Sequence, residues 1–66
     1  MQIYLNGAEK QIPDTLDMAG LIELLDLTGE RVAVEVNEAL VPRSTFSGLP
    51  LQEQDRVEII QAVGGG

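Results

Sequence analysis

The chain contains no histidine, no cysteine and no tryptophan, and each absence excludes a class of chemistry. Without cysteine it can form no disulfide, no thiolate zinc site and no iron–sulfur cluster. Without histidine it lacks the commonest general base and the partner of a catalytic serine or cysteine. A chain of 66 residues buries one thin core and leaves no room for a cleft of enzyme size. We therefore expect a protein that is not an enzyme and that holds no metal or other bound cofactor.

Basic residues are also scarce, because four lysines and arginines stand against eleven acidic residues and the net charge is −7. Nothing in the chain can neutralise a row of phosphates, and the negative charge disfavours anionic membrane surfaces. No stretch approaches the ~20 apolar residues of a membrane-spanning helix, and the first residues do not read as a secretory signal. We expect a cytoplasmic protein, monomeric when free, that binds neither nucleic acid nor membrane.

Residues 1–12 predict a β-hairpin. Apolar and polar residues alternate over residues 1–5, with the period of a strand that buries one face. Asn6-Gly7 is the preferred pair for a two-residue type I′ turn, since both positions need a positive φ. The polar residues at 9–11 suit a returning strand at the edge of a sheet.

Residues 16–27 predict a helix. Pro13 ends the preceding strand, and Asp14 or Thr15 is the expected N-cap. Gly29 is the expected C-terminal stop. The apolar positions fall on one stripe, and two further leucines widen it. These residues are Met18, Leu21, Ile22 and Leu25, with Leu24 and Leu27 beside them.

Three further strands are predicted at residues 32–36, 40–41 and 56–63. Pro42 confines the middle one to a sheet edge. The intervening residues 43–54 form an irregular loop that we expect Phe46, Leu49 and Leu51 to anchor to the core.

This order of elements predicts an α+β fold, with a mixed sheet of four to five strands and one helix packed across one face. A helical connection between the second and third strands also lets the first and last strands lie side by side. That arrangement is the β-grasp. Residues 1–63 would form the domain and residues 64–66 a flexible C-terminal tail, and the second face of the sheet would stay uncovered.

The three glycines at residues 64–66 are the unusual feature of the sequence. Three extended residues reach about 10 Å, and glycine passes a narrow channel because it has no Cβ. The tail would therefore be a flexible segment that ends in the free carboxylate of Gly66. Gly64 and Gly65 would pass through a narrow channel on a partner. The alternative is a frayed end or a spacer without function.

A partner-contact patch is predicted beside the tail. If Ile3 and Leu5 face the helix, Tyr4 faces away, and so does Ile60. With the first and last strands adjacent, Tyr4, Ile60 and Ala62 would share the uncovered face near the root of the tail. The alternatives are single exposed apolar residues of no function, or a strand register shifted by one residue.

The charged residues near the last strand admit two interpretations. Glu53, Asp55 and Glu58 are candidates for contact with a basic partner surface, or they serve solubility alone. Arg43 and Arg56 are expected to be partners in surface ion pairs rather than functional groups.

Four segments in order carry a family resemblance: VAVEVN at 32–37, VPR at 41–43, DRVEI at 55–59 and the glycines at 64–66. Together they resemble the ThiS family, the ubiquitin-like β-grasp sulfur carriers of thiamine (thiazole) biosynthesis. The resemblance covers nearly the whole chain. The sequence departs from the family at Gln54, where a glycine is usual, and at Phe46, where a tryptophan-like aromatic is common.

The resemblance implies that Gly66 is the site of covalent modification and that Gly64 and Gly65 enter the active sites of partner enzymes. An adenylyltransferase related to ubiquitin-activating enzymes would use ATP to convert the Gly66 carboxylate to an acyl-adenylate. A persulfide derived from a cysteine desulfurase would then supply sulfur, leaving a thiocarboxylate that thiazole synthase consumes. ATP would bind to the activating enzyme, and the carrier itself would hold no cofactor.

Other functions share parts of this pattern. The small sulfur-carrier subunit of molybdopterin synthase has the same tail but is usually longer, and a ubiquitin-like modifier attached to lysines is a further relative. From a different class, a non-conjugating β-grasp docking module would carry the glycines incidentally.

Overall fold

Two β-hairpins joined by one later strand make the sheet. The computed structural model describes residues 1–62, so the predicted tail and residue 63 lie outside the described residues. The elements follow in the order β1 (Gln2–Leu5), β2 (Ala8–Gln11), α1 (Met18–Leu24), β3 (Val32–Val36), β4 (Ala39–Val41), the 3₁₀ helix η1 (Arg43–Thr45) and β5 (Arg56–Gln61). The five strands are ordered β2-β1-β5-β3-β4. Only the β1–β5 pair is parallel, and the predicted α+β, β-grasp arrangement is confirmed.

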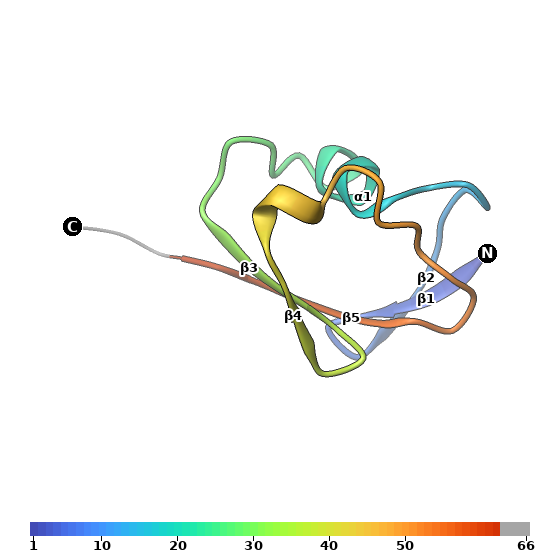
Figure 1. Ribbon diagram of the computed structural model, residues 1–66. Helices are drawn as coiled ribbons and strands as arrows, with labels where there is room; N and C mark the ends of the chain where they lie inside the picture. The colour runs from blue at the N-terminus through green and yellow to red at the C-terminus, as the bar shows by residue number, and fades with distance from the viewer. Residues whose placement is uncertain (63–66) are drawn as a thin grey trace.

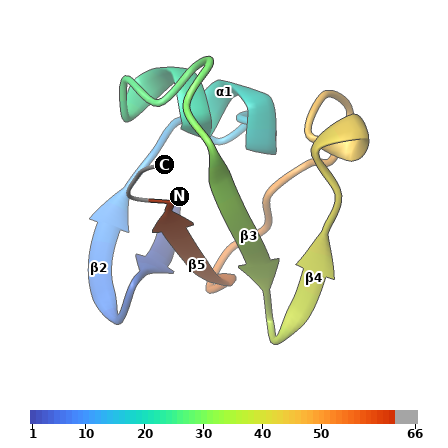
Figure 2. The ribbon, with the colours of Figure 1, turned by 90° about the vertical axis from the view of Figure 1, so that its left-hand side faces the viewer.

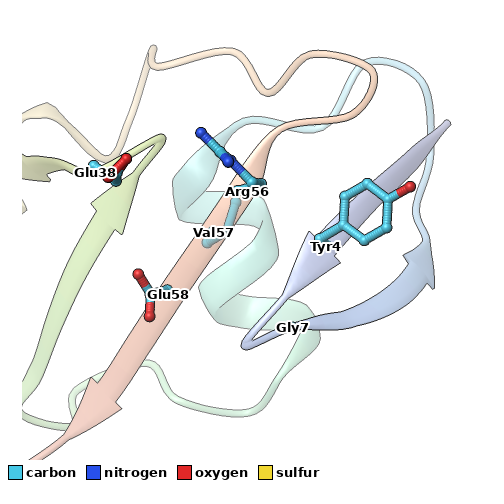
Figure 3. Close-up of a pocket in the computed structure, with 6 residues that line it drawn as sticks. All are labelled: Tyr4, Gly7, Glu38, Arg56, Val57 and Glu58. Atoms are coloured by element: carbon cyan, nitrogen blue, oxygen red, sulfur yellow. The ribbon is translucent and has the colours of Figure 1, made fainter.

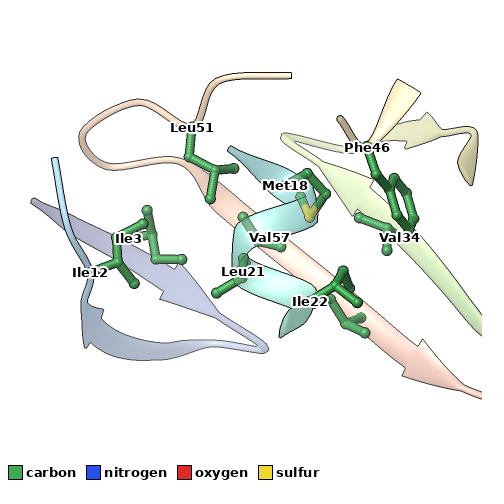
Figure 4. Packing of buried hydrophobic residues seen from close by; sticks show 10 residues of the cluster. Ile3, Ile12, Met18, Leu21, Ile22, Val34, Phe46, Leu51 and Val57 are labelled. Carbon is green, nitrogen blue, oxygen red and sulfur yellow. The ribbon is translucent and has the colours of Figure 1, made fainter. Parts of the chain in front are cut away.

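Helix α1 covers one face of the sheet (Figures 1 and 2). The apolar side chains between the two layers form one cluster (Figure 4). Its members are Ile3, Ile12, Met18, Leu21, Ile22, Val34, Phe46, Leu51, Val57 and Ile59. The alternating valines of β3 and the helical stripe of α1 supply this core because period 2 and period 3.6 each direct one set of side chains inward. Among residues 1–62, no helix or second sheet covers the opposite face of the sheet (Figure 2).

The start of α1 differs from the prediction, because Asp17 and not Asp14 or Thr15 is the N-cap. The Asp17 carboxylate accepts hydrogen bonds from the amides of Gly20 at 2.8 Å and Gly48 at 3.1 Å. It thereby joins the helix to the loop that follows η1. These amides, Gly48 above all, hold the pKa of Asp17 below its ordinary value.

Asp14 has a different role from the predicted cap. Its carboxylate contacts the Met1 amino group at 2.6 Å. That ammonium group lowers the pKa of Asp14 through the hydrogen bond and its charge. Because Asp14 is exposed, the pair contributes little to stability.

The end of α1 also differs from the prediction. Leu25 is the C-cap, and Asp26 adopts the left-handed φ of 60° that ends the helix. The amides of Asp26 and Leu27 bond back to Glu23 and Ile22, as in a Schellman motif. The predicted stop Gly29 lies in the next turn at φ 84°. Leu24, expected on the covered stripe, is 53% exposed because the helix ends beside it.

The loop before β5 packs as expected on Phe46 and Leu51, which are buried, with Leu49 partly buried. It ends in a turn in which Gln54 has a φ of 71°. The Gln54 amide donates to the Gln2 carbonyl at 2.7 Å. The turn therefore keeps a left-handed position at the residue where the family usually has glycine.

Replacing Gln54 with glycine should stabilise the protein. A residue with a Cβ at positive φ is strained by about 1–2 kcal/mol, and glycine removes this strain. Because glycine loses more chain entropy on folding, part of the gain in stability is offset. We expect Gln54→Gly to raise the free energy of unfolding by about 0.5–1 kcal/mol, measured by urea denaturation. Gln52→Gly is the matched control, since Gln52 is also exposed but has no positive φ. If both changes destabilised the protein equally, Gln54 would not be strained.

Candidate docking face and tail root

β5 carries the chain toward the tail from the middle of the sheet. It pairs in parallel with β1, Tyr4 opposite Arg56 and Leu5 opposite Val57. On its other side it pairs with all of β3, from Val36 opposite Val57 to Val32 opposite Gln61. Gly64, Gly65 and Gly66 lie outside the described residues. β5 thus has β1 and β3 as neighbours at its start, whereas β3 alone pairs with it as far as Gln61.

Two asparagines extend the pairing of β5, Asn6 on the side of β1 and Asn37 on the side of β3. Asn6 has a φ of 51°, and its side chain bonds the backbone of β5 as a further residue of β1 would. Its Oδ1 accepts from the Ile59 amide at 2.9 Å, and its Nδ2 donates to the Ile59 carbonyl at 3.3 Å. Asn37 extends the pairing of β5 with β3 at the start of β5, since its Oδ1 accepts from the Arg56 amide at 3.0 Å and its own amide donates to the Arg56 carbonyl. The Asn6-Gly7 pair was predicted for its turn, and the second role of Asn6 is visible only in the structure.

The root of the tail, Gln61 and Ala62, is fixed by residues just before β3. The Ala62 amide donates to the Arg31 carbonyl at 2.8 Å. The Gln61 side chain donates to the Glu30 carboxylate at 2.7 Å. The chain therefore passes residue 62 in a set position against β3.

The face of the sheet opposite α1, here called the outer face, carries a mixed set of side chains. Side chains alternate between the two faces along a strand, and directly paired residues share a face, so the residues of the outer face on β1, β5, β3 and β4 can be identified from the pairing. Its members include Tyr4, Arg56, Glu58, Ile60, Ala33, Glu35 and Leu40. Ile60 and Leu40 are 67% and 72% exposed. The outer face thus offers large apolar side chains to solvent.

The structure places the predicted patch residues on this face but does not bring all of them together. Ile60 and Ala62 line one open hollow of about 400 Å³ with Arg31, Val32, Ala33 and Arg43, which we call the tail-root hollow. Tyr4 lies opposite Arg56, which precedes Ile60 by four residues on β5. At the rise per residue of a strand, Tyr4 is thus about 13 Å from Ile60 along the sheet. The expectation that Tyr4 lies near the tail is therefore wrong. The role of Ile60 and Ala62 in docking stays a prediction.

Tyr4 lines a different hollow on the outer face, of about 470 Å³ (Figure 3). The other lining residues are Gly7, Glu38, Arg56, Val57 and Glu58. The Tyr4 hydroxyl accepts a hydrogen bond from the Gln2 side chain at 3.3 Å. Two carboxylates around one guanidinium give this hollow no preference for an anionic ligand.

Two of the three acids proposed to meet a basic partner have structural roles instead. The Glu53 carboxylate accepts from the Gln2 amide at 2.7 Å. Asp55 accepts from the Gln52 amide at 2.8 Å and from the Asn37 side chain at 3.0 Å. Both therefore hold the turn before β5, and Glu58 alone of the three stands on the outer face.

The described residues contain no ion pair of Arg43 or Arg56, contrary to the expectation. Within residues 1–62 the Met1 amino group and Asp14 form the sole ion pair. Arg43 instead donates to the Glu30 carbonyl at 2.6 Å.

Within residues 1–62, the carboxylates do not gather into a group able to hold a metal ion. The described helices are too short or too polar to cross a membrane.

Comparison with known proteins gives consistent relatives. Residues 3–66 match the sequence model of the ThiS family. A protein of Porphyra purpurea, "Uncharacterized protein ycf40", is 38% identical over the whole chain, which covers 93% of that protein. A "Thiazole synthase" of Magnetococcus marinus is 39% identical over the whole chain, which spans only 20% of that protein's length. The crystal structure of "thiamine biosynthesis protein (ThiS)" from Geobacter metallireducens superposes over 100% of both chains with a TM-score of 0.84 at 28% identity.

Proposed function

The chain belongs to the ThiS family, and we propose that it carries sulfur as a thiocarboxylate on Gly66. As a family member it is a small ubiquitin-like sulfur carrier of thiamine biosynthesis and is not itself a catalyst. The proposal adds the atom that bears the sulfur and the two reactions that load it.

The chemistry follows from the poor reactivity of a carboxylate. Its oxygen is a poor leaving group, so an adenylyltransferase first transfers AMP from ATP to the Gly66 carboxylate and releases pyrophosphate. A persulfide, formed with sulfur from a cysteine desulfurase, then attacks the acyl carbon and displaces AMP. A thiol cleaves the resulting acyl disulfide, becoming a disulfide itself, and leaves the thiocarboxylate. ATP binds to the adenylyltransferase, and the carrier holds no cofactor.

The observation that carries the proposal is the course of β5. This strand ends at Gln61, and the next residue is held by the Arg31 carbonyl, so the final four residues begin from a fixed point. Glycine at 64–66 suits a segment that must enter an active site, since it has no side chain to clash there. The chain has neither histidine nor cysteine, and a carrier that is modified on its main chain needs neither.

Thiazole synthase is the proposed acceptor of the sulfur. In Magnetococcus marinus a segment similar to this whole chain makes up about a fifth of a protein named thiazole synthase. A covalent link of this kind favours a functional contact between carrier and synthase. We place the contact in the cytoplasm, between a monomeric carrier and the enzyme.

Intact mass spectrometry tests the proposal. The protein is incubated with ATP, an adenylyltransferase of the ubiquitin-activating type, a cysteine desulfurase, cysteine and a thiol. We expect a gain in mass equal to the exchange of one oxygen for sulfur, located on Gly66 by fragmentation. Omission of ATP is the control and should prevent the change. A non-conjugating docking module would keep its original mass in both reactions.

A further inference from the structure

Half of the basic residues of this acidic protein lie at the root of the tail. The chain has four basic residues against eleven acidic ones. Two of the four, Arg31 and Arg43, line the tail-root hollow together with Ile60 and Ala62. Neither is engaged in an ion pair within residues 1–62, although acidic residues are abundant there. Their charges are therefore left available at one place on the surface.

Both arginines are held where they are by backbone contacts. The Arg43 guanidinium donates to the Glu30 carbonyl at 2.6 Å, which leaves its other N–H groups for a second acceptor. Arg31 is fixed through its own carbonyl, which accepts from the Ala62 amide. The Glu30 carboxylate is bound to Gln61, which alternates with Ile60 and so points to the other side of the sheet. The hollow is thus a cationic rim around an apolar floor.

The middle of the outer face has the opposite charge. Glu35 and Glu58 are directly opposite each other on β3 and β5. Like charges in such a pair repel each other and destabilise the sheet. Arg56 also lies on this face, but in a hollow that two carboxylates, Glu38 and Glu58, line. Two residues beyond Glu58 along β5, at Ile60, Arg31 and Arg43 line the hollow without a carboxylate. The charge pattern therefore favours an anionic group at the tail-root hollow over one at the middle of the outer face.

We propose that the tail-root hollow binds carboxylate side chains of thiazole synthase, which pair with Arg31 and Arg43 around an apolar contact to Ile60. The inference deepens the proposed function and rests on it. Carboxylates match the guanidinium fork, which bonds them with two parallel N–H groups. A contact at this place aligns the synthase with the first residue of the tail, so that the glycines lead directly into its active site.

Binding of charge-reversed variants to purified thiazole synthase tests the inference. We expect Arg31→Glu and Arg43→Glu each to raise the Kd about tenfold at low salt, chiefly by slowing association, and the difference should shrink as salt is added. Lys10→Glu is the matched control, because it changes the net charge equally but lies on edge strand β2. We expect its Kd to stay within about twofold of the unchanged protein.

The outcomes separate this inference from the proposed function. If the unchanged protein acquires the thiocarboxylate but the arginine variants bind the synthase as tightly as Lys10→Glu, the inference is wrong and the function stands. An equal loss for Lys10→Glu would mean general repulsion and would also overturn it. If the unchanged protein neither acquires sulfur nor binds, both fail. Arg31→Gln, which only removes charge, serves if a reversed variant unfolds, and we expect about a threefold rise in Kd.

Discussion

A chain that lacks Gly65 and Gly66 is expected to fold normally and to accept no sulfur. Its terminal carboxylate moves back by two residues, about 7 Å in an extended chain. Reacting atoms must come within about 3–3.5 Å, and displacements of even 1 Å are costly. The truncated carboxylate therefore stays out of reach of ATP in the activating enzyme. Mass spectrometry should show full conversion of the intact chain and none of the truncated one.

Stability and length need separate controls in that experiment. The core residues lie between Ile3 and Ile59, so urea denaturation of the truncated chain should match the full chain. A semisynthetic chain that ends in a Gly66 carboxamide keeps the length but has no carboxylate oxygen to attack ATP, and it should also remain unmodified. Sulfur transfer to the truncated chain would show that Gly66 is not the reacting residue.

Leu21→Ala should remove a large part of the stability of the domain. Leu21 belongs to α1 and is fully buried in the core, so loss of its side chain leaves a cavity. Such changes cost about 2–5 kcal/mol, whereas a 66-residue chain has a total of about 3–10 kcal/mol. The midpoint of urea denaturation should fall steeply. Circular dichroism is the suitable probe because the chain has no tryptophan.

Leu24→Ala is the matched control for that prediction. It makes the same change on the same helix, but at a residue that is 53% exposed. We expect its effect to stay within about 0.5 kcal/mol. Equal losses at Leu21 and Leu24 would contradict the packing of α1 described above.

Local patterns in the sequence predicted most of the fold. The alternation at residues 32–36, the Asn6-Gly7 turn and the stripe of Met18, Leu21 and Ile22 each depend on neighbours in the chain, and each is confirmed. The helix ends were predicted less well. Asp17 is the cap because it also bonds Gly48, which is distant in sequence. Asp26 takes the left-handed position although Gly29 was the better candidate by residue type.

The candidate site depends on contacts that no local pattern contains. The distance between Tyr4 and Ile60 follows from the parallel register of β1 and β5, which alternation alone leaves open. Arg31 and Arg43 line one hollow with Ile60 and Ala62 because β3 runs antiparallel to β5 and β4 lies beyond β3. If the pairing of Val32 with Gln61 had been known, it would have indicated that Arg31 lies beside the root of the tail. The expectation of ion pairs for Arg43 and Arg56 was wrong for residues 1–62, because acidic residues that are abundant in a sequence need not lie beside an arginine in the fold.

The central place of β5 also governs when the protein can fold. The β1–β2 and β3–β4 hairpins have no direct ladder with each other and are joined through a strand that is made after both. On the ribosome, Ile3 and Val34 therefore have no Val57 to pack against until that strand has emerged. Pairings between residues so distant in sequence are slow to form, and a stalled nascent chain exposes unpaired strand edges. Translation that pauses before residue 56 should thus leave a species prone to aggregation and proteolysis.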